Sequence, residues 1–184
     1  MRKVSDVLKD AVSCLNELDI EYVVVGGFAV MYHGRPRATA DLDIVAVLDP
    51  MCAEKLALGL KERGFFADVK DLKRSLEEKS HCTIEDKETM FRLDIKGVYD
   101  DADQRALDNR VLIEWKDMKM YIASAEDTVI NKLLWGREQD LEDALSIITR
   151  QGDMDNEYLK NTARDVGVMD LLEALEEKTE DHLL

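Results

Sequence analysis

The pattern of hydrophobic and polar positions divides this chain into two parts. In the earlier part, short apolar runs alternate with stretches of helical spacing, and in the later part only helical spacing occurs. Apolar runs of four to eight residues have the length of strands, whereas apolar residues at every third or fourth position indicate helices. The pattern predicts strands at 22–25, 41–48, 65–69, 81–86, 90–96, 110–115 and 118–122, and helices at 4–18, 28–33, 51–63, 71–78 and 101–107. From residue 124 onward only helices are expected, at 124–135, 138–150, 155–164 and 168–181.

Strands followed by a run of helices are typical of an α+β (mixed α/β) architecture, in which helices flank a mixed β-sheet. We therefore expect two parts. The first, over residues 1–123, would be a domain that contains the sheet. The second, over residues 124–184, would be a C-terminal helical region packed on that domain.

Two carboxylates stand at the start of the second predicted strand, in the stretch Asp41-Leu42-Asp43. Because residues i and i+2 of a strand point to the same face, Asp41 and Asp43 should project side by side, with Val45 and Val47 continuing that face as apolar core. Two ionised carboxylates this close repel each other, and a bound divalent cation would remove the conflict. Mg²⁺ suits such a site because it prefers a few carboxylates together with phosphate and water oxygens.

Paired glycines, Gly26 and Gly27, end the apolar run that precedes these acids. Glycine lets the backbone approach a ligand closely, and the start of the helix that follows offers unpaired N–H groups to a phosphate. Glycines and acids together predict a magnesium-dependent site for a nucleoside triphosphate.

The order of an apolar strand, Gly-Gly, thirteen residues and Asp-x-Asp resembles the nucleotidyltransferase superfamily, whose palm domain is like that of DNA polymerase β. A third acid of that family stands on a later strand, and Asp94 is the best match for it. The stretch 124–133, followed by Arg137 and by 140–143, resembles a branch that includes enzymes of abortive-infection toxin–antitoxin systems.

This resemblance implies that a nucleoside monophosphate passes from a triphosphate to a hydroxyl acceptor, with release of pyrophosphate. The acceptor would be an RNA end, a protein or a small molecule. Two Mg²⁺ ions, replaceable by Mn²⁺, would be held by Asp41 and Asp43, with Asp94 at the ion that activates the acceptor. Gly26 and Gly27 would shape the cradle for the phosphates.

Three basic residues and a threonine are candidates for nucleotide contacts. The resemblance implies that Lys132 contacts the triphosphate, while a lysine in mid-helix is also compatible with a solvated position. Arg35 and Arg37 flank Pro36, so each is either a phosphate contact or an ordinary exposed arginine of a turn. Thr39 could bond to the turn or to a phosphate, and the turn is the favoured partner.

Three of the acids have structural alternatives. Asp94 could pair with Arg92 or Lys96, which share its face of the predicted strand. Asp140 and Asp143 are spaced i, i+3 and so share one helix face, where they could cap the helix or pair with Arg137.

The charge balance limits the partners. The chain has 40 acidic against 25 basic residues and a net charge of −15. We therefore expect no extensive binding to double-stranded DNA, because proteins that track a nucleic-acid backbone usually present a basic surface. The acidic end of the chain could instead bind a basic protein, such as the antitoxin partner of a toxin–antitoxin pair.

Several features predict a cytoplasmic protein that does not enter a membrane. No apolar run approaches the roughly 18 residues of a membrane span, and the first residues are too polar for a signal peptide. The three cysteines lack metal-binding or disulfide spacing, which favours a reducing compartment.

Two alternatives to an active enzyme remain open at this stage. The same fold could bind a nucleotide without chemistry, or it could serve only as a protein-interaction module. Either alternative leaves the three acids without a purpose.

Overall fold

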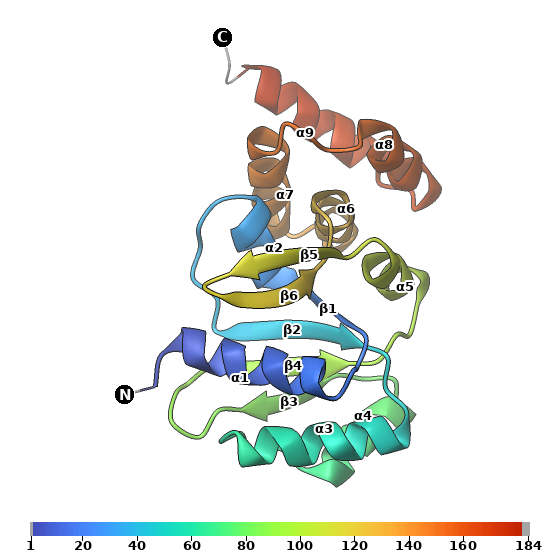
Figure 1. Cartoon of the computed structure of the whole chain (residues 1–184). Helices are drawn as coiled ribbons and strands as arrows, with labels where there is room; N and C mark the ends of the chain where they lie inside the picture. The colour runs from blue at the N-terminus through green and yellow to red at the C-terminus, as the bar shows by residue number, and fades with distance from the viewer. Residues whose placement is uncertain (1, 182–184) are drawn as a thin grey trace.

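The computed structural model describes residues 2–181, which form a six-stranded mixed sheet with helices on both of its faces and at one end (Figure 1). The predicted α+β class is confirmed. The strands are β1 (Tyr22–Val25), β2 (Asp41–Ala46), β3 (Cys82–Glu85), β4 (Arg92–Lys96), β5 (Val111–Trp115) and β6 (Met118–Ile122). The helices are α1 (Val4–Glu17), α2 (Gly26–His33), α3 (Pro50–Glu62), α4 (Val69–Glu77), α5 (Asp101–Asp108), α6 (Ala125–Trp135), α7 (Glu138–Arg150), α8 (Asn156–Asp165) and α9 (Met169–Asp181).

The strands lie in the order β3-β4-β2-β1-β6-β5. Strand β2 is central: it pairs antiparallel with β1 and parallel with β4. Strands β3 and β4 pair antiparallel with each other. Because β2 and β4 are parallel neighbours, side chains at the same register position point to the same face of the sheet.

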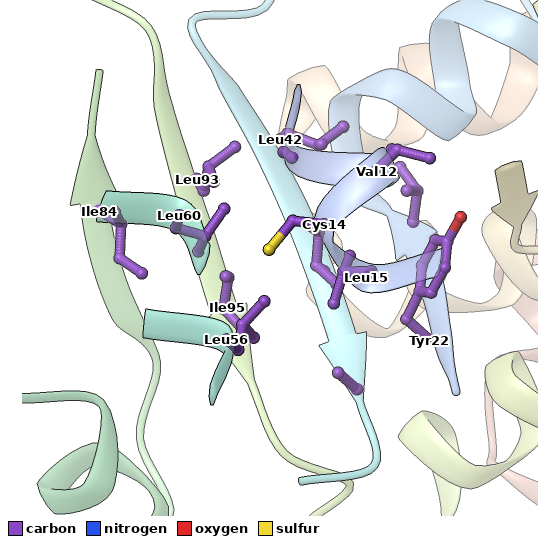
Figure 2. Packing of buried hydrophobic residues seen from close by; sticks show 14 of the residues in the cluster. Val12, Cys14, Leu15, Tyr22, Leu42, Leu56, Leu60, Ile84, Leu93 and Ile95 are labelled. Carbon is purple, nitrogen blue, oxygen red and sulfur yellow. The ribbon is translucent and has the colours of Figure 1, made fainter. Parts of the chain in front are cut away.

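One face of the sheet is covered by α1 and α3, which bury the main hydrophobic core. Leu15 of α1 and Leu56 and Leu60 of α3 are at most 1% exposed and pack against strand residues such as Leu42 and Leu93 (Figure 2). These strand side chains alternate with residues that point to the opposite face. The core therefore fixes which face of β2 remains available for its acids.

The opposite face is covered by α5, which contacts β1 and β2. Val23 and Val45 pack there against Ala106 and Leu107 of α5. Strand β2, with acids at its start and Val45 buried beyond them, thus continues into a small apolar cluster. The acids stand at the margin of that cluster.

The helices after β6 form a hydrophobic cluster of their own, which includes Val129, Leu133 and Ile147 and also Val30 of α2. Helix α6 contacts α2 and α5 as well as its neighbours α7 and α8. Contacts therefore cross the boundary between residues 123 and 124, and that division into two parts stays a prediction.

Three local predictions differ from the structure. The strand over 65–69 is wrong: Phe65 forms an isolated bridge with Asp86, and Asp68 caps α4 by accepting from the backbone N–H groups of Lys70 and Asp71. That cap turns the chain into a helix where the apolar run alone indicated a strand.

The second and third differences lie at the ends of β2 and α2. Val47 is 47% exposed and outside the core, because β2 ends at Ala46. Helix α2 begins at Gly26 rather than Phe28, so both glycines belong to its first turn.

Within residues 2–181, no helix combines the length and apolar character needed to cross a membrane. The last part of the acidic tail, residues 182–184, lies outside the described residues.

Candidate active site

Register places the three predicted acids at one edge of the sheet. Asp43 of β2 is directly opposite Asp94 of β4, and Asp41 is opposite Arg92. All four side chains point away from the main core, toward the face that carries α5. Residues 51 positions apart in the sequence, Asp43 and Asp94, are therefore neighbours because two parallel strands pair in this register.

Gly26 allows the backbone to approach Asp43 closely. It has φ +61°, a conformation that L side chains rarely adopt, and a Cβ built on it would lie 2.0 Å from Asp43 Oδ2. At Gly27 a Cβ would lie 2.8 Å from Thr39 Oγ1, and the Gly27 N–H donates to the Asp43 carboxylate. In this structure Gly26 therefore makes room for the Asp43 carboxylate, and the backbone of Gly27 favours its charged form.

The pKa of the Asp43 carboxyl is strongly shifted. Burial, followed by the neighbouring charges of Asp41 and Asp94, raises the pKa of Asp43 from 3.8 to about 6. The Gly27 N–H and the positive charge of Lys132 act in the opposite direction, but more weakly. A cation bound beside this buried carboxyl would offset the repulsion from the two like charges.

Arg92 and two threonines hold the other two carboxylates. Arg92 Nη2 is 3.2 Å from Asp41 Oδ2, and its Nε is 3.9 Å from Asp94 Oδ2. Thr39 donates to Asp41 Oδ1 at 2.9 Å, and Thr83 donates to Asp94 Oδ1 at 2.5 Å. The pairing of Asp94 with Arg92 was among the alternatives from the sequence, whereas the contact of Arg92 with Asp41 was not.

The other proposed partner of Asp94 is engaged elsewhere. Lys96 Nζ lies 2.8 Å from Asp103 Oδ1 on α5, so Lys96 pairs with that helix. The interpretation of Thr39 as a residue that bonds the turn agrees with its bonds to the backbone and side-chain oxygens of Asp41.

The donor set fits a hard divalent cation. Over the described part of the chain, no three His, Cys, Asp or Glu side chains are arranged to hold a metal ion as they stand. Magnesium, however, needs only one or two protein carboxylates when phosphate and water oxygens complete its shell. Asp41 and Asp43 can provide these, provided that Arg92, whose side chain is 49% exposed, releases Asp41.

A cationic cluster lies beside the acids, where α6 and α7 meet. Lys132 Nζ is 2.8 Å from Asp140 Oδ1 and 3.2 Å from Asp143 Oδ2. Arg137 Nε contacts Asp140 at 2.6 Å, and Arg37 Nη1 contacts Asp143 at 2.6 Å. Three cations thus surround two anions, which leaves this cluster with a local charge of about +1 if all five groups are ionised.

The two acids of this cluster are structural partners. Asp140 is 1% and Asp143 0% exposed. Although burial acts to raise it, the hydrogen bonds from Arg137 and Lys132 hold the pKa of Asp140 below its ordinary value. Lys132, with a side chain only 13% exposed, is therefore anchored and is not the solvated lysine of the alternative interpretation.

A cleft of about 770 Å³ joins these features. A volume of this size is in the range of small-molecule sites. Arg35 is not among the residues that line it, because its guanidinium pairs with Glu142 on the outside of α7. The lining residues that bear on function are Gly26, Gly27, Arg37, Asp41, Asp43, Asp94, Asn131, Lys132, Trp135 and Arg137.

Trp135 also belongs to this wall, and the sequence analysis gave it no role. Its position one turn after Lys132 on the same helix was the available signal.

Comparisons with known proteins give one family match and several structures with the same fold. A family model described as "Nucleotidyltransferase of unknown function (DUF6036)" matches residues 2–180. No curated protein matches the sequence.

Solved structures share the fold. An antigenic nucleotidyltransferase-like protein from Paracoccidioides brasiliensis is 18% identical, with a TM-score of 0.54 over 93% of this chain and 92% of that chain. The antibiotic-resistance factor ANT(2'')-Ia is 14% identical, with a TM-score of 0.55 over 96% of each chain. The lincosamide antibiotic adenylyltransferase LnuA is 18% identical, with a TM-score of 0.55 over 81% of this chain and 98% of that chain. At such identities the likeness shows the fold alone.

The pKa of Asp43 predicts a pH-dependent effect of Asp43→Asn. A carboxyl whose folded-state pKa is raised to about 6 contributes stability below its unfolded pKa and loses it as the pH rises through 6. Without added metal, Asp43→Asn should therefore raise the melting temperature at pH 8 by several degrees, since about 1 kcal/mol corresponds to about 2–4 °C at this size. The gain should vanish near pH 4.

The matched control for this prediction is Asp153→Asn, which changes an exposed acid in a loop and should move the melting temperature at neither pH. An Asp43→Asn protein that melts lower than the wild type at pH 8 would contradict the charge repulsion described above.

Gly26→Ala should destabilise the fold through two separable effects. Gly167 has φ +76° with nothing near its missing Cβ, so Gly167→Ala reports the cost of the backbone conformation alone, about 1–2 kcal/mol. Gly152 has open space and an ordinary φ, so Gly152→Ala should be neutral. Gly26→Ala should cost more than Gly167→Ala in urea unfolding, because the Asp43 carboxylate must also move. Equal costs would show that the close approach to Asp43 is unimportant.

Lys132→Met should lower the free energy of unfolding by about 2–4 kcal/mol, since it removes one cation from two buried carboxylates. The control is Lys73→Met. Lys73 pairs with Glu54, whose side chain is 51% exposed, so loss of this ion pair should lower the free energy of unfolding by less than about 1 kcal/mol. Urea unfolding of both variants measures the difference. Similar small losses would refute the anchoring of Lys132.

Proposed function

Since this chain belongs to a family of nucleotidyltransferases, the family whose model matches residues 2–180, we propose that it transfers a nucleoside monophosphate from a nucleoside triphosphate to a hydroxyl group, in a magnesium-dependent reaction. The observation that carries this proposal is the register of β2 and β4, which sets Asp43 opposite Asp94 beside the left-handed Gly26.

Asp41 and Asp43 are the residues that would hold magnesium, with Asp94 as the third acid. We expect Mn²⁺ to be able to replace Mg²⁺ there. When bound, the cation supplies charge neutralisation for the triphosphate and lowers the pKa of the attacking hydroxyl. Displacement of Arg92 from Asp41 would accompany binding, because the guanidinium contacts the same carboxylate.

The chain's own residues supply position and charge. The anchored cations Lys132 and Arg37 line the cleft and would face the β- and γ-phosphates. Asp94, held by Thr83, would orient the acceptor hydroxyl and accept its proton. Phosphoryl-transfer chemistry needs little more than this, because positioning and electrostatic stabilisation supply most of the rate.

The reaction balances as follows. The acceptor oxygen forms a bond to the α-phosphorus, the bond from that phosphorus to the bridging oxygen of the β-phosphate breaks, and pyrophosphate leaves. The proton of the acceptor hydroxyl passes to Asp94 and then to solvent.

The acceptor in this proposal is a small molecule, a protein side chain or a short RNA end. A long nucleic acid is disfavoured because the net charge of −15 would repel an extended phosphate backbone. A role in a toxin–antitoxin pair, with a basic antitoxin bound to the acidic helices, belongs to the same proposal and is tested by co-purification from the native cell.

The deciding measurement is α-³²P labelling. The purified protein is incubated with each labelled nucleoside triphosphate, Mg²⁺, and either total RNA or whole-cell lysate. Wild type should transfer label to one species and release pyrophosphate. Asp41→Asn/Asp43→Asn should reduce transfer to the level without protein, because the carboxylates that would hold the cation are gone.

Asp153→Asn is again the control, since it removes an exposed acid far from the named site in sequence and should keep full transfer. Transfer by the double variant at the wild-type rate would overturn the assignment of the acids. Tight nucleotide binding without transfer to any acceptor would favour the alternative in which the fold binds a nucleotide but catalyses no transfer.

A further inference from the structure

An exposed tryptophan stands on the wall of the cleft and has no role in the reaction as described. Trp135 is the last residue of α6 and is 71% exposed. Large aromatic side chains contribute most to binding when they are covered by a partner. The neighbouring Leu134, 44% exposed, lines the same wall.

Trp135 continues the face of α6 that carries the anchored lysine. Thr128, Asn131, Lys132 and Trp135 all line the cleft. Asn131 and Lys132 follow Thr128 by three and four residues, and Trp135 follows them by four and three, so the four lie on successive turns of one helix face. Trp135 follows Lys132 by about 4.5 Å along the helix axis, so it stands on the next turn of the wall.

The tryptophan ring contacts one member of the cationic cluster. The guanidinium carbon of Arg137 is 5.6 Å from the centre of the Trp135 ring. The same arginine contacts Asp140, which in turn contacts Lys132. Gly136, in the left-handed conformation with φ +64°, ends the helix between the two residues. The Trp135 ring and Lys132 are thus linked through Arg137 and the buried carboxylate of Asp140.

We propose that Trp135 is a stacking platform for the base of the nucleoside triphosphate, and that the amide of Asn131 on the preceding turn bonds the edge of that base. This inference rests on the proposed function, because it needs a triphosphate near Lys132. The ligand class is a purine nucleoside triphosphate, whose larger ring system covers more of the exposed indole. An amide can both donate to and accept from a base edge.

Stacking on an aromatic side chain contributes enough to be measured. Removal of an aromatic ring from under a stacked base corresponds to a loss of about tenfold in affinity. Inorganic tripolyphosphate has no base, so its binding should be unaffected by the same substitution. The difference between the two ligands isolates the platform from the phosphate site.

Fluorescence of a single tryptophan provides the first test. Trp115 is the other tryptophan of the chain and packs edge-on against Phe28, away from the cleft lining. In a Trp115→Phe protein with Mg²⁺, ATP and GTP should quench the remaining emission of Trp135, CTP and UTP less so, and tripolyphosphate not at all.

Equilibrium binding of labelled ATP provides the second test. Trp135→Leu should weaken ATP binding about tenfold and leave tripolyphosphate binding unchanged, while Trp135→Phe retains most of the ATP affinity. Trp115→Phe is the matched control and should change neither. Because Trp135 is exposed, its replacement should not disturb folding.

Two other outcomes are informative. Equal ATP affinity in wild type and Trp135→Leu would overturn the platform and leave the proposed function standing. A wild-type protein that binds neither ATP nor tripolyphosphate would overturn both together.

Discussion

Repulsion among three carboxylates at one edge of the sheet is the constraint on which the rest of the site depends. The register of two parallel strands sets Asp43 against Asp94, and the strand period adds Asp41 on the same face. Such a group is stable only if its charge is reduced or balanced. The protein uses burial to shift the pKa of Asp43 and the guanidinium of Arg92 to balance the other two acids.

A second charge arrangement, of opposite sign, follows from the first. In the proposed reaction, a site with acids on one wall would also accept phosphates, so it needs cations that do not pair with those acids. Asp140 and Asp143 hold Lys132 and Arg37 on the other wall, and both acids are buried. Charges paired in this way inside a protein keep their positions better than long side chains that extend into solvent.

Much of this could be predicted from local pattern. Helical spacing located the later helices within one or two residues, and glycines followed by Asp-x-Asp marked the acidic edge. The strand expected at 65–69 failed because capping by Asp68 outweighs a short apolar run.

Contacts that depend on register or on the packing of distant elements could not be predicted. The contact of Arg92 with Asp41 requires knowing which residues of β2 and β4 face each other. Spacing showed that Asp140 and Asp143 share a helix face, but not that this face is turned inward. Exposure of Trp135 likewise depends on where α6 ends relative to the cleft.

The ion pair between Arg37 and Asp143 has a consequence for how this protein can change over evolutionary time. It joins the segment before β2 to α7, 106 positions later in the chain, and its carboxylate is fully buried. Asp143 also contacts Lys132, so loss of Arg37 alone leaves the buried carboxylate one cation, whereas loss of Asp143 leaves Arg37 without this carboxylate partner. A helical region borrowed from a distant relative would therefore have to bring its own acid for this arginine.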